Sequence, residues 1–293
     1  MRRRLWAAAL LAAGCAPKPT TTASPPTPEP QPADAPILSI PAPVPTSSAV
    51  RFGPGAWRYV VHQDVRMEHD RIDMPPTSQL GWSTFVAATI TGPAEAAGYP
   101  ALFTVDSIKP DSGVRLPPWI DLTMARGLRF IGHLAPTGEF VGGRVSDSVS
   151  AENLAMLVGR FQHFYPRIPA SGVNLGDTWT DTLTLIDRGG GRVTTRKTVR
   201  RVRAAAWEDT PGGRALRLEV SEQYELTELG SSGGQAIEAK GTGVGASVER
   251  LGAGGRFLGT VARDSSNLVI TLPAQGLVIA RRQITTTTVT VLP

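Results

Sequence analysis

Apolar and polar residues alternate along most of the chain beyond about residue 52, a pattern that predicts β-strands with one buried face. In the segment 57–68, one parity is apolar or aromatic and the other is charged or polar, and the segment 216–226 repeats this signature. Turns rich in proline and glycine separate most of the further strand-like runs. These runs are 81–91, 101–108, 128–134, 139–145, 178–186, 192–207, 243–251, 256–270 and 277–292.

One segment has helical spacing instead. Between residues 151 and 165, apolar side chains recur every three or four positions, which predicts a helix with one apolar stripe. Ser150 precedes the run as a potential N-cap, and Pro166 ends it. We therefore expect one main helix, 151–165, whose apolar stripe lies on a sheet.

The helix separates two similar halves, about 51–148 and 170–293. The motifs Gly138-Glu-Phe-Val-Gly142 and Gly255-Arg-Phe-Leu-Gly259 align at an offset that also superposes Asp147 on Asp264. The order of strands is similar on both sides of the helix. We interpret this as an internal duplication, with about five strands before the helix and five plus a final long strand after it.

A basic run between residues 192 and 203 contains six cations and is the obvious candidate for an anionic partner. A hairpin turning at 209–213 explains it differently, because antiparallel pairing then sets opposite charges across from each other. This register predicts the pairs Glu208–Arg214, Arg203–Glu219, Arg200–Glu222 and Lys197–Glu225. Internal neutralisation is the favoured interpretation, and a phosphate or lipid-headgroup patch is the alternative.

The N-terminus predicts the location of the protein. Three arginines, a short apolar run and Ala12-Ala13-Gly14-Cys15 resemble the signal peptide and lipobox of bacterial lipoproteins, in which the cysteine is acylated. We expect a signal peptide at 1–14 and a lipidated Cys15. A disordered linker rich in proline and threonine should follow at 15–50. The all-β domain would then cover 51–293.

Lipidation implies attachment to the bacterial cell envelope through N-terminal acyl chains. No Asp follows Cys15, so we expect the outer membrane, with the domain facing the periplasm. Removal of the three arginines with the signal lowers the formal net charge from +5 to +2. The high pI then gives no argument for a nucleic-acid partner.

No motif identifies a reaction, a metal or a cofactor. The segment 230–234 fits the G-x-S-x-G pattern and 241–246 fits G-x-G-x-x-A, but neither is followed by the helix that a nucleophile elbow or a dinucleotide site requires. The four histidines share no metal-ligand spacing. The sequence therefore favours a protein that is not an enzyme.

The order of features resembles a group of uncharacterised bacterial all-β lipoproteins: the lipobox, the linker, Trp57-Arg58-Tyr59, and the segment from Val173 to Trp179 containing Gly-Asp-Thr-Trp. More distantly, a curved antiparallel sheet crossed by a helix is similar to the half-barrel of LolA/LolB-type lipoprotein carriers and LppX/LprG-type lipid binders. The resemblance implies a mainly β half-barrel of about 11 strands with one main helix.

The half-barrel resemblance also implies a function, namely a cavity for a lipid or other hydrophobic ligand. The expected cavity wall consists of Trp57, Tyr59, Trp82, Phe103, Leu157, Phe161, Leu218 and Tyr224. The same residues would also suit a solid core. The alternative function is a structural or interaction module that binds another envelope protein through an exposed sheet edge.

Overall fold

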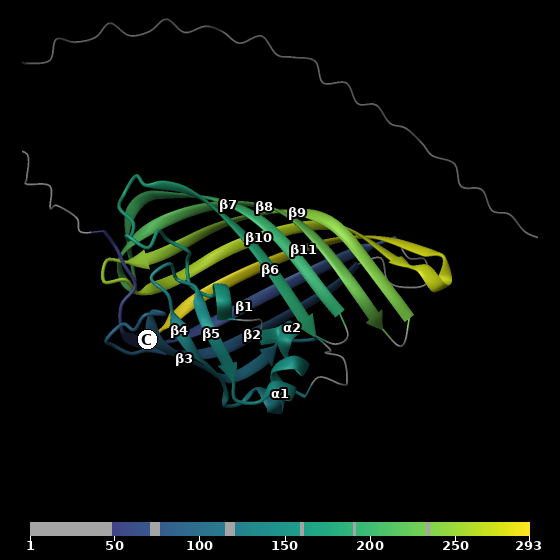
Figure 1. Ribbon diagram of the computed structural model, residues 1–293, viewed down its shortest axis with the longest axis horizontal. Coiled ribbons are helices and arrows are strands. Elements are labelled where there is room, and N and C mark those ends of the chain that lie inside the picture. Colours follow the sequence, from purple (N-terminus) through teal and green to yellow (C-terminus); the bar gives the residue numbers. More distant parts are fainter. Residues whose placement is uncertain (1–48, 71–76, 115–120, 159–160, 190–191, 233–234) are drawn as a thin grey trace, which may run out of the picture. The chain divides into compact units, whose positions relative to one another are not determined.

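The computed structural model describes residues 49–70, 77–114, 121–158, 161–189, 192–232 and 235–293 (Figure 1). The predicted signal peptide, Cys15 and most of the linker lie outside these residues. One compact unit covers Thr46–Pro293. Val50, next to the expected start of the domain at residue 51, already packs with this unit, because its side chain is only 3% exposed and its backbone pairs with Val173.

The described part of the chain is built mainly from long strands, in line with the alternating pattern. The strands are β1 (Gly55–His69), β2 (Thr77–Ile90), β3 (Tyr99–Pro110), β4 (Leu128–Leu134), β5 (Phe140–Val145), β6 (Thr178–Gly189), β7 (Arg192–Thr210), β8 (Gly213–Ser232), β9 (Gln235–Gly252), β10 (Phe257–Leu272) and β11 (Leu277–Leu292). The helices are all short: α1 (Ser148–Asn153), α2 (Ala155–Val158), and the 3-10 turns η1 (Leu122–Ala125), η2 (Phe161–His163) and η3 (Pro273–Gln275). No described helix has the length and apolarity needed to cross a membrane.

The strands form one open antiparallel sheet in the order β5-β4-β3-β2-β1-β11-β10-β9-β8-β7-β6. Each half is a meander of neighbouring hairpins, and the pairing of β1 with β11 joins the two halves. The sheet curves strongly into a half-barrel whose free edges are β5 and β6 (Figure 1). This confirms the expected mainly β fold of about 11 strands.

The strand count of five, five and one agrees with the two halves read from the sequence. The aligned glycines also share a conformation, because Gly138 and Gly255 both have a positive φ in the turn that enters the fifth strand of their half. Non-glycine side chains are strained in this region of φ and ψ. The common geometry supports the internal duplication, which stays a prediction.

The expectation of one continuous helix at 151–165 is wrong. Helix α1 starts earlier, at Ser148, because the carboxylate of Asp147 accepts hydrogen bonds from the backbone N–H groups of Val149 and Ser150. The cap is thus Asp147 rather than Ser150. The apolar stripe continues through α2 into η2, but as short pieces that follow the curved inner face of the sheet.

The expected register of the β7–β8 hairpin is confirmed for three of its four opposite-charge pairs. The cations and carboxylates lie directly across from each other at Lys197–Glu225, Arg200–Glu222 and Arg203–Glu219. Alternation of side chains sends these pairs to different faces of the sheet.

The fourth pair, Glu208–Arg214, is wrong because the hairpin register shifts between Ala204 and Ala206. An extra residue in one strand offsets all pairing beyond it by one position. Glu208 therefore lies opposite Ala215, and its carboxylate instead pairs with the guanidinium of Arg250 on β9.

The core lies on the inner face, beneath a cluster of rings that we call the aromatic plug: Phe161, Phe164 and Tyr165. Phe161 stacks on Phe103 of β3 with 4.5 Å between ring centroids. Phe164 and Tyr165 contact Tyr59 of β1 and Phe257 of β10 edge-on or tilted. The plug therefore joins the two halves through one packed cluster of rings.

Candidate functional site

The structure explains seven of the eight expected cavity residues by core packing. Trp57, Tyr59, Trp82, Phe103, Leu157, Phe161 and Leu218 all belong to the hydrophobic core or pack against it. The indole N–H of Trp82 donates a hydrogen bond to the backbone carbonyl of Leu157 at 2.9 Å. Tyr224 lies apart from this cluster. None of the eight lines a described pocket, so their role as ligand contacts stays a prediction that the described pockets do not support.

A pocket of about 270 Å³ lies instead beside the plug, on the inner face of the second half. One wall is apolar, formed by the plug rings of Phe164 and Tyr165 and by Phe257. Two side chains of the edge strand β6, Leu183 and Leu185, extend this wall. The opposite wall is charged, so the pocket has an apolar side and a polar side.

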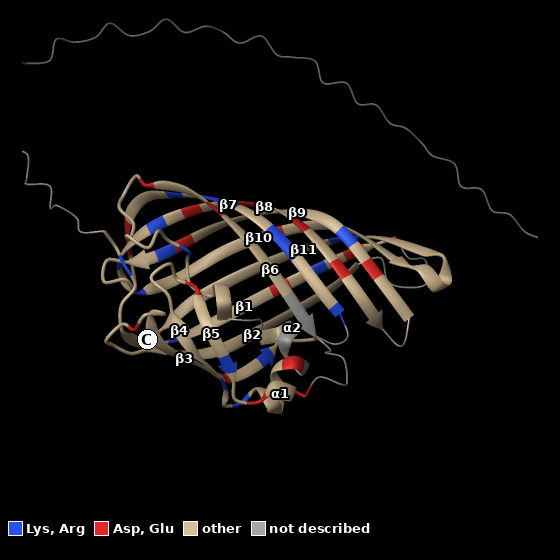
Figure 2. Cartoon of the chain, in the orientation of Figure 1, with Lys and Arg blue, Asp and Glu red and all other residues tan. Residues whose placement is uncertain are grey.

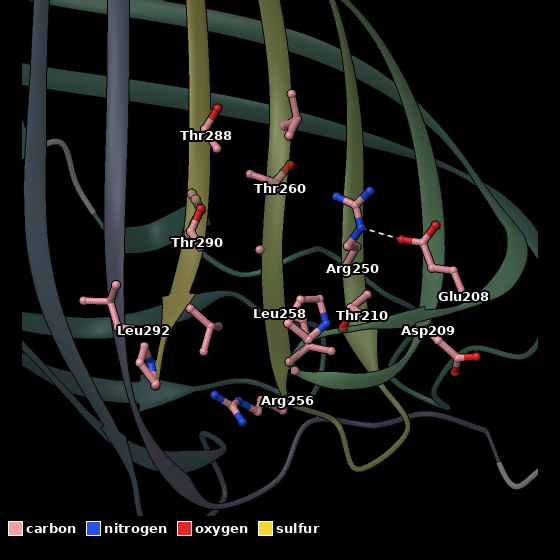
Figure 3. Close-up of a pocket in the computed structure, with 17 residues that line it drawn as sticks. Glu208, Asp209, Thr210, Arg250, Arg256, Leu258, Thr260, Thr288, Thr290 and Leu292 are labelled. Atoms are coloured by element: carbon pink, nitrogen blue, oxygen red, sulfur yellow. Dashed lines mark hydrogen bonds and ion pairs between the residues drawn. The ribbon is translucent and has the colours of Figure 1, made fainter.

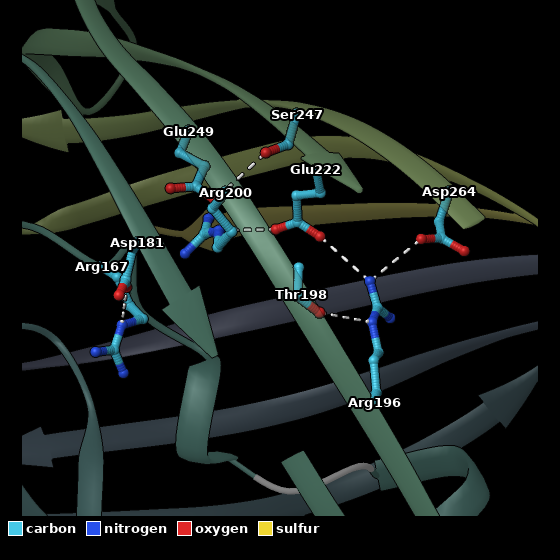
Figure 4. A network of polar contacts seen from close by, with 9 residues as sticks. All are labelled: Arg167, Asp181, Arg196, Thr198, Arg200, Glu222, Ser247, Glu249 and Asp264. Carbon is cyan, nitrogen blue, oxygen red and sulfur yellow. Dashed lines mark hydrogen bonds and ion pairs between the residues drawn. The ribbon is translucent and has the colours of Figure 1, made fainter. Parts of the chain in front are cut away.

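The polar wall is a network of two arginines and three carboxylates from four neighbouring strands (Figure 4). Arg200 pairs with Glu222 at 2.7 Å and with Glu249 at 2.8 Å. Arg196 pairs with Glu222 at 3.2 Å and with Asp264 at 3.4 Å. Each guanidinium is therefore shared between two carboxylates, and carboxylates outnumber cations.

Tyr224 anchors one end of this network. Its hydroxyl donates a hydrogen bond to Asp264 at 2.6 Å, and the Arg196 guanidinium lies 3.6 Å from the centre of its ring. Burial, followed by the contact with the Asp264 carboxylate, raises the pKa of Tyr224. Tyr224 therefore stays protonated and acts as a hydrogen-bond donor that orients Asp264.

Glu249 is the carboxylate with the least complete set of partners. Its Oε1 atom accepts from Arg200 and from the Ser247 hydroxyl, whereas its Oε2 atom is buried without a hydrogen-bond partner. Burial raises the pKa of Glu249, and the pairing with Arg200 offsets only part of that effect. Both ring nitrogens of His163, also on the pocket wall, are buried without partners.

Arg167 closes the opening of the half-barrel near the pocket. Its guanidinium donates to Glu139, next to edge strand β5, at 3.0 Å, and to Asp181 of the other edge strand, β6, at 2.6 Å. Burial alone would raise the pKa of Glu139, but hydrogen bonds from Gln162 and Arg167 outweigh it and hold the pKa below its usual value. Arg167 therefore connects the two edge strands of the sheet, close to the aromatic plug.

A larger groove of about 770 Å³ lies at the end of the second half, where β9, β10 and β11 meet the β7–β8 turn (Figure 3). Glu208 pairs with Arg250 across it, and Thr288 and Thr290 form part of its wall. The lining contains equal numbers of acidic and basic side chains and no aromatic ring. It therefore offers neither an excess of one charge nor a stacking surface, and the inner pocket is the better candidate site.

One of the two motifs set aside in the sequence, 241–246, has a structural role, whereas the other, 230–234, lies partly outside the described residues. Residues 241–246 lie within β9, where Gly243 faces the ring of Tyr224: an added Cβ would lie 2.2 Å from that ring. The glycine thus makes room for a side chain of the polar network. Among the described residues, no group of three or more His, Cys, Asp or Glu side chains is placed to hold a metal ion.

The sequence interpretation did not identify the polar wall as a site. The basic run is divided between two faces: Arg196 and Arg200 point inward, whereas Arg203 pairs with Glu219 on the outer face. The alternation along β7 could have identified this wall, because Arg200 has the same parity as the buried residues Val202 and Ala204. A charged residue at an otherwise apolar parity marks an inward charge.

Comparison with known proteins found no family model that matches the chain and no curated protein with significant sequence similarity. The site is therefore interpreted from its own geometry.

Proposed function

We propose that the protein binds a small amphipathic ligand in the inner pocket, as a non-catalytic, membrane-tethered protein of the cell envelope. The observation that carries this proposal is the two-sided lining of the pocket: Phe164, Tyr165 and Leu183 on one side, and the network centred on Arg200 on the other. A ligand with an apolar and a polar end would satisfy both walls. The lipid anchor, expected from Cys15, would hold the pocket close to a source of such molecules.

The size of the pocket argues for a modest ligand. Pockets for drug-sized molecules span roughly 300–1,000 Å³, so a volume of about 270 Å³ accommodates a head group or a short chain. Beyond the polar network, the inner face of the long strands carries the apolar side chains of Leu226, Leu268, Ile270 and Ile279, with the charged Glu228 and Arg281 among them. This strip would support an alkyl chain leaving the pocket along the groove.

The second candidate function is the interaction module, and one observation favours it. Strand β6 is 12 residues long and forms a free edge of the sheet, paired only with β7. A long unpaired edge presents backbone N–H and C=O groups that can accept a strand from another protein. Edge strand β5 is only six residues long and contacts the connecting segment at η2, so it is less suited to this role.

The test uses the full chain carrying Cys15→Ser, so that no acyl group of its own competes for the pocket. Decylamine, decanoate and decan-1-ol are titrated below their micelle concentrations and followed by isothermal calorimetry. Leu183→Asn, on the pocket wall, should weaken binding of every probe about tenfold or more, because it puts an uncharged polar group against the chain. Thr184→Asn, the exposed neighbour, should leave binding unchanged.

The two candidate functions give different results in this experiment. Binding of at least one decyl probe, weakened in Leu183→Asn and kept in Thr184→Asn, supports the amphiphile-binding function. Absence of binding by all three probes contradicts it and favours the interaction module that binds a partner through edge strand β6.

A further inference from the structure

We infer that the inner pocket selects ligands whose polar end is a cationic amine, with Glu249 as the group that recognises it. This inference rests on the proposed function and adds the chemical class of the ligand. It would make the protein a receptor for amphiphiles with an exposed ammonium group, in contrast to fatty acids or other anionic lipids.

The charged groups around the pocket favour a cationic ligand. Three carboxylates face the pocket from Glu222, Glu249 and Asp264, against the guanidinium groups of Arg196 and Arg200. Arg263 also borders the pocket, but it has the opposite parity to Asp264 on β10 and its side chain is exposed, so it points to the outer face. Next to them, Arg167 is already held between Glu139 and Asp181. The local excess is therefore negative. An incoming anion would meet more carboxylates than cations at short range, where charges interact strongly because solvent screening is weak.

The three carboxylates differ in how many of their oxygens have hydrogen-bond partners. Both oxygens of Glu222 are engaged by arginines, and Asp264 accepts from Tyr224 and Arg196. By contrast, Oε2 of Glu249 is buried without a partner. A buried acceptor left unpaired costs free energy, which a ligand donor recovers on binding. His163 and the Tyr165 hydroxyl on the same pocket also lack hydrogen-bond partners, but Oε2 of Glu249 is the unpartnered carboxyl oxygen. Its missing partner is a donor, and a cation is the strongest donor because its charge also favours the ionised form of Glu249.

The aromatic wall opposite the polar network also favours an ammonium group. The rings of Phe164, Tyr165 and Phe257 line the same pocket as Glu249. Aromatic faces attract ammonium groups electrostatically. Burial, followed by the nearby Arg167, lowers the pKa of His163, so this imidazole is neutral at pH 7 and adds no competing positive charge. Rings and carboxylate thus favour the same type of group.

The experiment compares decylamine with decanoate, two probes with equal chains and opposite charge at pH 7, on the full chain carrying Cys15→Ser. We expect decylamine to bind about tenfold more tightly or better, as is typical of one charge-assisted hydrogen bond. Glu249→Gln, which keeps the shape and removes the charge, should reduce this preference to about threefold or less.

The matched control is Glu219→Gln, the same substitution on the outer face of β8, where Glu219 pairs with Arg203. It should keep the full preference for decylamine. Circular dichroism establishes that each variant is folded. If Glu249→Gln does not fold, the preference of the Cys15→Ser chain for decylamine over decanoate is the result that tests the inference.

The remaining results separate this inference from the function beneath it. Decanoate binding as tightly as decylamine, or more tightly, overturns the cationic selection and leaves the amphiphile-binding function intact. A full preference for decylamine in folded Glu249→Gln also overturns it, since another group would then recognise the amine. Absence of binding by decylamine, decanoate and decan-1-ol contradicts the proposed function itself.

Discussion

The two halves of the sheet share one topology and differ in what covers their inner face. In the first half, β1 to β5 place Tyr59, Val86 and Phe103 beneath the aromatic plug, where they are fully buried. In the second half, inward positions include Arg200 and Glu249, on strands of 19 and 18 residues. An inner face covered by the aromatic plug must be apolar, because an unpaired charge buried there would cost free energy. An inner face that extends beyond the plug can carry charge.

Charged residues are also distributed along the strands of the second half. Lys, Arg, Asp and Glu mark the long strands β7 to β10 in both signs, along much of their length (Figure 2). The comparison shows that a curved sheet of uniform topology can combine a tightly packed region with a charged region that borders a pocket. The following predictions test that division.

The largest effect is expected in the first half. Phe103→Ala removes a ring that is completely buried and stacked on Phe161, so the free energy of unfolding should fall by about 4 kcal/mol. Urea denaturation of the full Cys15→Ser chain measures it. Ile131→Ala, at an exposed outward position on the neighbouring strand β4, should change stability by less than about 0.5 kcal/mol. Similar losses in both variants would contradict the plugged core.

The second prediction concerns the charged half. Arg200, whose side chain is 7% exposed, neutralises Glu222 and Glu249, so Arg200→Met leaves two poorly solvated carboxylates together. We expect a loss of about 3 kcal/mol. Arg203→Met removes a guanidinium that is 63% exposed, and it should cost about 1 kcal/mol or less.

The same denaturation assay also tests the pairing of Arg200 with Glu222. The exchange Arg200→Glu with Glu222→Arg should recover part of the stability that Arg200→Glu loses, because the two residues lie directly opposite each other. A double variant as unstable as the summed single variants would show that the register does not govern this interaction.

The third prediction is a dependence on pH at Glu249. Because its pKa is raised above the ordinary 4.5, the folded state favours the protonated carboxyl. The stability this provides is present below pH 4.5 and is lost as the pH rises through the raised pKa. Relative to the unsubstituted chain, Glu249→Gln should therefore become progressively more stable above pH 4.5, as urea denaturation at several pH values would show.

Glu219→Gln should show the opposite trend. Hydrogen bonds from Arg203 and then Arg217 lower the pKa of Glu219, so the charged carboxylate stabilises the folded state above pH 4.5. Removing it should cost more at neutral than at acid pH. If both variants follow the same trend, the environment of Glu249 differs from the one described.

Local patterns predicted much of this architecture because they depend on residues close in sequence. Period-two alternation identified strands, and opposite charges around one turn determined most of the β7–β8 register. The same reasoning failed at Glu208, since the shift between Ala204 and Ala206 leaves no mark in a pattern of charges. It also failed for the helix at 151–165, because helical spacing does not reveal where a segment must break to follow a curved surface.

The candidate site was less predictable than the fold. Aromatic and aliphatic residues such as Tyr59, Phe103 and Leu218 are equally suited to a core and to a cavity wall, and only the position of the plug separates the two roles. The charged wall is built from β7, β8, β9 and β10, whose residues come together only after four long strands pair. No single segment contains that arrangement.

By itself, then, the sequence determined which segments are strands, which parity of the segments 57–68 and 216–226 faces inward, and most of the pairing across the β7–β8 turn. These properties follow from side-chain periodicity and short-range geometry. Only the tertiary structure decided that β1 pairs with β11, that the plug packs against rings of both halves, and that Glu249 keeps an unpartnered oxygen beside the rings. The physical reason is that burial and electrostatic environment are sums over contacts from distant segments, and those contacts exist only once the sheet has curved around its core.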